Sequence, residues 1–250
     1  MKRVGLQRTA LITGAARGIG RAICDALASQ GIRILALDQD HGALSTSVNE
    51  LRLAGATVDP LFTDLADASD LASVLAEIVK AGTEVDVLVP CAAIDPREDQ
   101  LRVPLESAHR QFAVNMLATL QMVEAFVPGM QQRGWGRVVA IGSVQEERPR
   151  PDNLIYAALK AAQTHAMRNW ARSAAGPNLT FNVVRPGAIE TDRNRDVLAD
   201  PAYRQAVLDR IPLGRLGRAA DCSAVVAWLC GEQAAYVNGA VIDVDGGMRL

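Results

Sequence analysis

The sequence predicts one α/β domain, a Rossmann-like, doubly wound sheet of about seven parallel strands with helices on both faces. Short apolar or β-branched runs alternate along the chain with amphipathic segments of helical length, which is typical of right-handed strand–helix–strand units. The run 138–141 is apolar throughout, as in strands that are buried on both faces. No linker, repeat or change of composition divides the 250 residues, so we expect a single domain over 1–250.

The elements follow in order from this alternation. Strands are predicted at 9–13, 32–37, 57–62, 85–89, 137–142, 180–184 and 240–244. Helices are predicted between them, near 18–30, 41–53, 68–81, 106–131, 153–174 and 219–230. The polar, arginine-rich stretch 187–218 interrupts the series, and an excursion of this length in a compact domain usually has a function. We expect it to form a lid over a binding site; the alternative is a surface insertion without a role.

Composition and charge exclude several classes of protein. Apolar residues make up 49% of the chain and charged residues 22%, the balance of an ordinary globular protein rather than of a disordered one. The net charge of −2 offers no positive field for nucleic acid or anionic lipid. No apolar run approaches the ~20 residues that cross a bilayer. Gln7 and Arg8 interrupt the N-terminal stretch before it could form a secretory signal.

The cysteines and histidines point to no disulfide and no metal site. The four cysteines form no C-x-x-C pair, and the three histidines form no cluster at the spacing of metal ligands. We therefore expect a reduced, cytoplasmic protein that has neither nucleic acid nor a membrane as a partner.

A glycine-rich turn joins the first predicted strand to the first helix, and it reads TGAARGIG over 13–20. Glycines there let the backbone turn sharply and approach a pyrophosphate at the positive N-terminus of the helix. Asp38 ends the second strand, 18 residues after Gly20. An acid at this place accepts hydrogen bonds from the adenosine ribose and repels a 2′-phosphate, which favours NAD. The alternative is a plain tight turn followed by a solvated aspartate.

Tyr156 and Lys160 lie four residues apart on a predicted helix and therefore share one face. The chain has only three tyrosines and three lysines, so this pair is unlike a chance spacing. Ser143 follows the buried strand that precedes the pair, at the edge of the sheet where α/β proteins bind ligands. Oxidation of an alcohol needs a base, and an ammonium within ~4–6 Å lowers the pKa of a tyrosine from its ordinary value near 10. Ser143 would stabilise the charge that develops on the reacting oxygen.

With these residues in place, the chain resembles the short-chain dehydrogenase/reductase (SDR) family over essentially its whole length. The resemblance rests on the order and spacing of the turn at 13–20, Asp64, Asn115, Ser143, Tyr156-x-x-x-Lys160, Arg185-Pro186-Gly187 and the closing Val244-Asp245-Gly246-Gly247. It implies that Tyr156 is the acid/base, that Lys160 modulates its pKa and binds the nicotinamide ribose, and that Ser143 orients the substrate. It also implies that Asn115 holds a water that links Lys160 to solvent; the alternative is a polar residue inside a helix that bonds to nearby backbone.

Asp38 favours NAD as the cofactor, and the resemblance implies a set of contacts to it. We expect the turn to hold the pyrophosphate, Asp64 and Leu65 to contact the adenine, and Pro186 to Ile189, with Thr191, to hold the carboxamide. The complete expected set is Gly14, Arg17, Gly18, Ile19, Gly20, Asp38, Asp64, Leu65, Cys91, Ala92, Tyr156, Lys160, Pro186, Gly187, Ile189 and Thr191.

One motif departs from the family pattern. Pro90-Cys91-Ala92-Ala93 stands where the family usually carries Asn-Asn-Ala-Gly. Pro90 lacks an N–H donor, and Ala93 adds a methyl group where space is short. We therefore expect a weaker or adjusted cofactor pocket. Cys91 has no partner cysteine or activating base in the sequence, which favours a small buried residue over a redox thiol.

The loops expected at the mouth of the site are polar, which favours a sugar, polyol or hydroxy acid as the substrate. Gln145 is the expected contact for a substrate hydroxyl. The charged residues expected in these loops are Arg97, Arg148, Arg150, Arg193, Arg195, Glu146, Glu147 and Asp152, with solvated ion pairs as the alternative for the arginines.

Three functions remain open on the sequence. The first is an NAD-dependent oxidoreductase that acts on a small polar substrate. The second is an NADPH-dependent 3-oxoacyl reductase of the same family, and the third is a cofactor-binding regulator without turnover, which the altered segment 90–93 suggests. The resemblance also implies a homotetramer, to which the apolar helix 224–229 would contribute.

Overall fold

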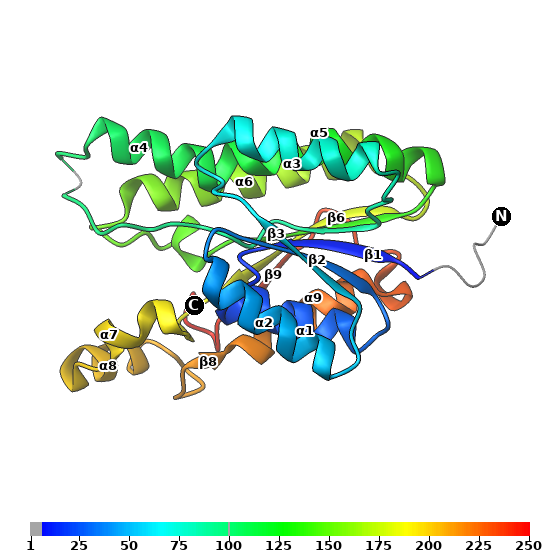
Figure 1. Cartoon of the computed structure of the whole chain (residues 1–250). Coiled ribbons are helices and arrows are strands. Elements are labelled where there is room, and N and C mark those ends of the chain that lie inside the picture. Colours follow the sequence, from blue (N-terminus) through cyan, green and yellow to red (C-terminus); the bar gives the residue numbers. More distant parts are fainter. Residues whose placement is uncertain (1–6, 100) are drawn as a thin grey trace.

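A computed structural model describes residues 7–99 and 101–250 (Figure 1). Seven strands form one parallel sheet, as the sequence predicted, and their order is β3-β2-β1-β4-β5-β6-β9. The strand bounds are β1 (Thr9–Thr13), β2 (Arg33–Asp38), β3 (Val58–Phe62), β4 (Val87–Val89), β5 (Gly136–Ile141), β6 (Leu179–Pro186) and β9 (Val241–Val244). The strand order reverses between β1 and β4, which is where open α/β sheets bind their ligands.

Helices cover both faces of the sheet (Figure 1). One face carries α1 (Gly18–Ala28), α2 (His41–Leu53) and α9 (Ala219–Cys230), and the other carries α3 (Ala68–Lys80), α5 (Ala118–Arg133) and α6 (Leu154–Ser173). Successive side chains of a strand point to opposite faces, so Leu11 packs into one core and its neighbour Ile12 into the other. Both side chains are fully buried, which explains why the interior of β1, between its two terminal threonines, is apolar.

The predicted helix 106–131 is in fact three segments, because a π-helical turn interrupts it. They are α4 (Leu105–Phe112), the turn η1 (Ala113–Leu117) and α5. A local change of hydrogen-bond pattern leaves the apolar periodicity almost unaltered, so the sequence did not show it. The stretch Leu105–Arg133 is long and apolar enough to span a bilayer by length and composition alone. Met122 and Phe126, however, pack into the core beneath the helix.

The excursion 187–218 folds into a small substructure, which we call the lid (Figure 1, yellow to orange). Its parts are β7 (Ile189–Glu190), η3 (Asp192–Asn194), α7 (Arg195–Leu198), α8 (Pro201–Leu208) and β8 (Gly217–Arg218). β7 and β8 pair in parallel and close the base of the lid. Leu198, Val207, Ile211 and Leu216 form an apolar cluster of their own within it.

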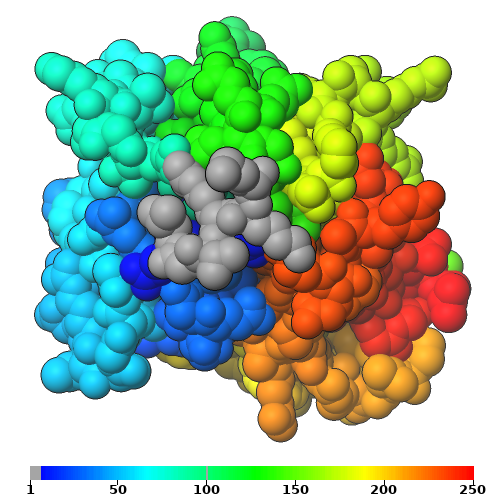
Figure 2. Space-filling view, turned by 90° about the vertical axis from the view of Figure 1, so that its right-hand side faces the viewer, coloured from blue at the N-terminus to red at the C-terminus, as the bar shows by residue number. Residues whose placement is uncertain are grey.

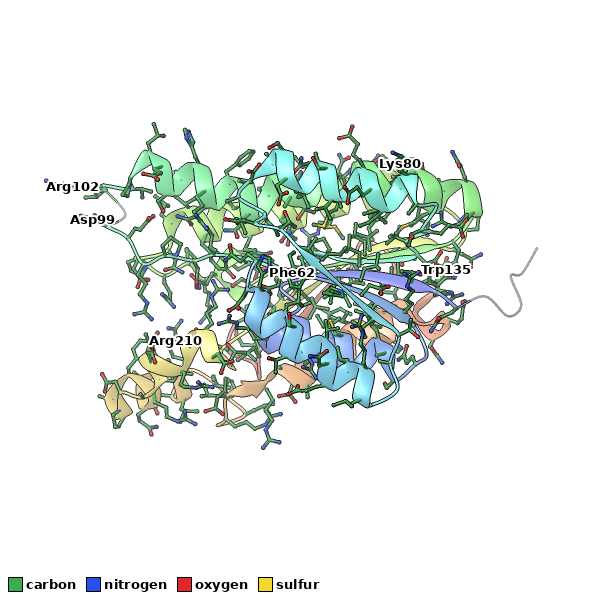
Figure 3. All side chains as sticks on the ribbon, in the orientation of Figure 1. Phe62, Lys80, Asp99, Arg102, Trp135 and Arg210 are labelled. Atoms are coloured by element: carbon green, nitrogen blue, oxygen red, sulfur yellow. The ribbon has the colours of Figure 1, made fainter. Side chains whose placement is uncertain are left out.

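The two ends of the sheet differ in character. Figure 2 faces the end of the molecule where the strands begin, and segments of both layers reach it, green and yellow-green above and blue and orange below. At the opposite end, the loop after β4 and the lid face each other across the edge of the sheet, as the labelled Asp99, Arg102 and Arg210 show (Figure 3). Two short 3-10 turns complete the fold, η2 (Val144–Glu146) after β5 and η4 (Glu232–Ala234) after α9.

Candidate active site

A cleft of about 1130 Å³ lies along the edge where the strands end. All of the predicted site residues line it except Asn115, which is fully buried. The fold therefore brings the expected residues together along one cleft, and their roles remain predictions. Among the described residues, no group of three or more His, Cys, Asp or Glu side chains could hold a metal ion.

The glycine turn has the geometry that a pyrophosphate requires. Gly14 has a φ of +69°, and a Cβ on Gly20 would lie 2.0 Å from the Gly14 carbonyl oxygen, so both positions need glycine. The first turn of α1 has no side-chain cap, and Arg17, Gly18 and Ile19 line the cleft there. Uncapped N–H groups at a helix N-terminus attract an anion, so this turn fits the pyrophosphate of a dinucleotide.

Asp38 is held in place at the end of β2 by two backbone N–H groups. Its Oδ2 accepts from Ala16 at 3.1 Å, and its Oδ1 accepts from Asp40 at 3.0 Å. Each oxygen retains a lone pair for a ribose hydroxyl. Asp40 pairs with Arg17, and a hydrogen bond from the Ala43 N–H, with a smaller effect from Arg17, holds the pKa of Asp40 below its usual value. The ribose end therefore carries the carboxylates of Asp38 and Asp40, and the Arg17 guanidinium beside them is already paired with Asp40.

The adenine end is formed by the loop after β3. Asp64 and Leu65 both line the cleft, and Leu65 is buried. Asp64 accepts a hydrogen bond from Arg110 at 3.2 Å and one from the Ala66 N–H at 2.9 Å. The carboxylate is thereby fixed in orientation before any ligand arrives.

The unusual segment after β4 is held by a residue that the sequence analysis did not single out. Thr13 Oγ1 accepts hydrogen bonds from the N–H groups of Cys91 and Ala92, both at 3.0 Å. The Pro90 carbonyl accepts from Ile141 at 3.0 Å and so ties the segment to β5. Thr13 therefore braces the segment without the amide side chains that the family usually has. The signal for this role was a hydroxyl residue at the last position of a buried strand.

Asn115 binds the loop after β4 with both ends of its amide. Its Oδ1 accepts from the Ile94 N–H at 2.9 Å, and its Nδ2 donates to the Ile94 carbonyl at 2.8 Å. The side chain therefore positions the loop that follows Ala93. The predicted water that links Lys160 to solvent stays a prediction.

Tyr156, Lys160 and Ser143 meet at the centre of the cleft. The Lys160 Nζ lies 5.9 Å from the Tyr156 ring centre and donates to the Ile141 carbonyl at 2.6 Å and to Gln163 Oε1 at 3.1 Å. Ser143 follows β5, and its hydroxyl hydrogen-bonds to Tyr156, which lowers the pKa of the tyrosine. The arrangement matches an acid/base with a neighbouring cation and an oxygen-binding hydroxyl.

Burial dominates the titration of this centre. It raises the pKa of Tyr156, and among the cations Arg193 has the largest opposing effect. The expected direction was the opposite one, because we gave the cations more weight than the loss of solvent. Burial also lowers the pKa of Lys160 from 10.5 to about 8.

Glu146 does not lie at the mouth of the site, where the sequence analysis placed it. Its side chain is 4% exposed, and its Oε1 accepts from the Ser143 N–H at 3.0 Å. Burial raises the pKa of this carboxyl. Glu147 does not line the cleft either; it pairs with Arg185 and Arg249. The Ser-x-x-Glu spacing of a capping box was the signal for the buried position.

The arginines expected at the mouth divide into two groups. Arg97 and Arg195 do not line the cleft and pair with Asp152 and Asp192, whereas Arg148, Arg150 and Arg193 do line it. Arg150 also pairs with Asp152, which itself lies outside the lining.

Gln145 carries an unused acceptor in the cleft. Its Oε1 is buried and has no hydrogen-bond partner among the described residues. A buried acceptor without a partner costs free energy, so this atom suits a hydroxyl donor on a bound molecule.

Comparisons with known proteins agree with the site. A family model described as enoyl-(acyl carrier protein) reductase matches residues 14–249. The chain is 34% identical to the 3-oxoacyl-(acyl-carrier-protein) reductase FabG of Escherichia coli over 97% of its length and 98% of that protein. It is also 34% identical to an L-rhamnose 1-dehydrogenase (NAD(P)(+)) of Sphingomonas sp., over 97% of this chain and 96% of that one.

A solved structure has the same fold. The gluconate 5-dehydrogenase of Burkholderia cenocepacia, in complex with NADP and tartrate, superposes with a TM-score of 0.90 at 30% identity, over 97% of this chain and 96% of that one. Fold, site and similarity agree over nearly the whole chain. The protein therefore belongs to the short-chain dehydrogenase/reductase family of oxidoreductases.

Proposed function

We propose that this protein is an NAD(H)-dependent oxidoreductase that interconverts a hydroxyl and a carbonyl group on a small polar substrate, a sugar, polyol or hydroxy acid. The observation that carries the proposal is the meeting of Tyr156, Lys160 and Ser143 in one cleft with the glycine turn and Asp38. Nicotinamide supplies or accepts the hydride when it is bound.

The residues of the chain divide the remaining work. Tyr156 takes the proton from the substrate hydroxyl during oxidation and returns it during reduction. Lys160 holds a positive charge beside the tyrosine and favours its ionised form. Ser143 donates to the reacting oxygen and keeps it next to the tyrosine. Pro186, Gly187, Ile189 and Thr191 line the side of the cleft where the carboxamide would lie.

Asp38 supports NAD over NADP. A 2′-phosphate would enter a region that holds the carboxylates of Asp38 and Asp40, and the Arg17 guanidinium there is already paired with Asp40. The named relatives use or hold NADP in two cases, which makes the cofactor preference the property to measure first.

A second candidate is an NADPH-dependent 3-oxoacyl reductase, which the similarity to FabG favours. Asp38 opposes this function, because its charge repels the phosphate that distinguishes NADPH. The polar residues Gln145, Arg148 and Arg150 in the lining also suit a hydrophilic substrate better than an acyl chain.

The test is a parallel titration of the purified protein with NADH and NADPH, followed by nucleotide fluorescence. We expect tight binding of NADH and weak binding of NADPH, with NADPH affinity rising in Asp38→Asn. Stronger binding of NADPH by the wild type would favour the reductase. If neither nucleotide bound, the segment 90–93 would have altered the pocket too far and the regulator without turnover would lead.

Turnover is tested separately with Tyr156→Phe, in screens of NAD⁺ with sugars, polyols and sugar acids. The variant loses one hydroxyl, so we expect it to bind NADH as the wild type does and to show no turnover. Activity that survives in Tyr156→Phe would refute the proposed acid/base.

We further propose a cytoplasmic homotetramer. Several large apolar side chains are exposed on the outer helices and near the C-terminal strand, as expected where copies of the chain meet. They include Phe112, Leu154, Trp228 and Tyr236. Light scattering of the purified protein gives the mass directly, and a monomer would refute this part of the proposal.

A further inference from the structure

Arg193 of the lid lies directly over the reacting tyrosine. Its guanidinium carbon is 5.6 Å from the centre of the Tyr156 ring, and Arg193 lines the cleft. It also has the largest pKa-lowering effect on Tyr156. The proposed mechanism uses Lys160 as its cation and assigns no role to Arg193. Arg193 is therefore available for a different task at the point where the substrate binds.

A carboxylate already sits on this guanidinium. Asp95, in the loop after β4, accepts from the Arg193 Nε at 2.7 Å and also pairs with its Nη2. Both side chains line the cleft and are partly exposed, 40% for Arg193 and 25% for Asp95. The pair shows that this position accommodates a carboxylate next to the catalytic centre, and that solvent reaches both charged groups.

The charge of the surrounding lining is positive. The substrate end of the cleft is lined by four arginines and two aspartates, namely Arg148, Arg150, Arg193, Arg210, Asp95 and Asp192. Asp192 is already paired with Arg195 of the lid, and Arg150 is paired with Asp152 just outside the lining. The positive charge therefore comes chiefly from Arg148, which donates to the Leu250 carbonyl, and from Arg210. Arg210 lines the cleft and lies on the lid, where Figure 3 labels it. It makes no ion pair or side-chain hydrogen bond with the part of the chain that the structure describes. A cleft with this balance attracts an anion, whereas the ribose end of the same cleft repels one.

We propose that the substrate is a short hydroxy acid, and that Arg193 binds its carboxylate in place of Asp95. This inference rests on the proposed function and narrows its substrate class. The planar guanidinium matches a carboxylate through two parallel hydrogen bonds, which fixes orientation as well as affinity. The incoming acid displaces Asp95 from Arg193, places its hydroxyl between Ser143 and Tyr156, and retains the positive lining around it.

Two substitutions separate this role from a simple latch between lid and loop. Arg193→Met removes the binding group, and Asp95→Asn removes the competing charge while keeping the shape. If Arg193 binds substrate carboxylate, the two variants change acid recognition in opposite directions. If the pair only closes the lid, both variants weaken closure and act in the same direction on every substrate.

The measurement is the ratio of kcat/KM for an acid to that for the matched polyol, with NAD⁺ as cofactor. D-gluconate is paired with sorbitol and D-xylonate with xylitol, because each pair differs chiefly in the carboxylate. We expect Arg193→Met to lower the ratio by roughly 10- to 100-fold, the effect of losing a charged hydrogen bond, and Asp95→Asn to raise it. Arg204→Met is the matched control, since Arg204 lies on the lid and both it and its partner Glu190 are outside the lining.

A binding measurement keeps the inference separate from the proposed function. Each acid and polyol is titrated by calorimetry into the complex of the full-length protein with NADH. Loss of acid binding in Arg193→Met supports the inference even if no compound is oxidised. The absence of oxidation would by itself refute the proposed function but not the inference. Equal acid binding by wild type and Arg193→Met, no binding of either acid by the wild type, or a parallel loss in both variants would overturn it.

Discussion

Lys160→Met tests whether the buried lysine carries its charge at a cost to the fold. Lys160 is 1% exposed, and burial lowers its pKa from 10.5 to about 8. Below that range the lysine is charged in both the folded and the unfolded chain. The folded state then bears an ammonium that it disfavours, because desolvation is the largest cause of the lowered pKa.

The sign and the size follow from proton linkage. Between about pH 8 and 10.5 the unfolded chain binds more protons at this residue than the folded chain, so the free energy of unfolding rises with pH. At about 1.4 kcal/mol per pKa unit, the whole rise is roughly 3 kcal/mol. Methionine cannot titrate, so the variant lacks this rise. The free energy of unfolding of Lys160→Met minus that of the wild type should therefore fall by roughly 3 kcal/mol across this range.

The assay is urea unfolding of both proteins at a series of pH values, because the difference between them cancels the other titrating groups. The methionine also loses the hydrogen bonds to Ile141 and Gln163, which adds an offset that does not depend on pH. The slope therefore decides, and a flat difference between pH 8 and 10.5 would refute the reasoning. Lys80→Met, which removes an exposed lysine from the last turn of α3, is the matched control.

Three further substitutions test the supports of the cleft. Thr13→Val should destabilise the fold by about 1–3 kcal/mol and weaken NADH binding, because it leaves two N–H groups after β4 without an acceptor. Urea unfolding measures the change in stability. The control is Thr180→Val, which removes a buried hydroxyl that has no partner among the described residues. Glu146→Gln should raise the free energy of unfolding near neutral pH, because burial disfavours the ionised carboxyl, and it should lower kcat. Glu147→Gln is the control. A loss of stability with an unchanged kcat would contradict this prediction. Gly20→Ala should abolish NADH binding in the fluorescence titration, since its Cβ would lie 2.0 Å from a carbonyl oxygen.

Much of the fold could be predicted because its signals are local and repeated. The strand β5 (136–141) is apolar at nearly every position, and α3 has its polar and apolar faces at helical spacing. The π turn at Ala113–Leu117 could not be predicted, since it adds one residue to a single turn and leaves the apolar stripe continuous. The short strands β7 and β8 were missed for a related reason, as two residues each carry no period.

The site could be predicted where the spacing of residues within one motif fixes how they lie relative to one another. Tyr156 and Lys160 share a helical face by their spacing, and the glycine turn carries its strand and helix with it. The contacts between distant segments could not be predicted in this way. Thr13 meets the segment after β4 only because β1 and β4 pair, and Arg193 meets Asp95 only because the lid folds back over the sheet.

Two charges beside the reacting tyrosine are held at a cost to stability. Burial lowers the pKa of Lys160 and raises that of Glu146, so the loss of solvent works against the charged form of each residue. The buried Cys24 also has a raised pKa, but its neutral thiol is the favoured form near neutral pH and costs nothing. Selection for stability alone would remove the lysine and the carboxylate, whereas acid/base chemistry needs charge that water does not screen. The cost therefore marks the place where this fold gives up stability for reactivity. That place is the surroundings of Tyr156, where Glu146 accepts from the Ser143 N–H and Lys160 lies beside the tyrosine ring.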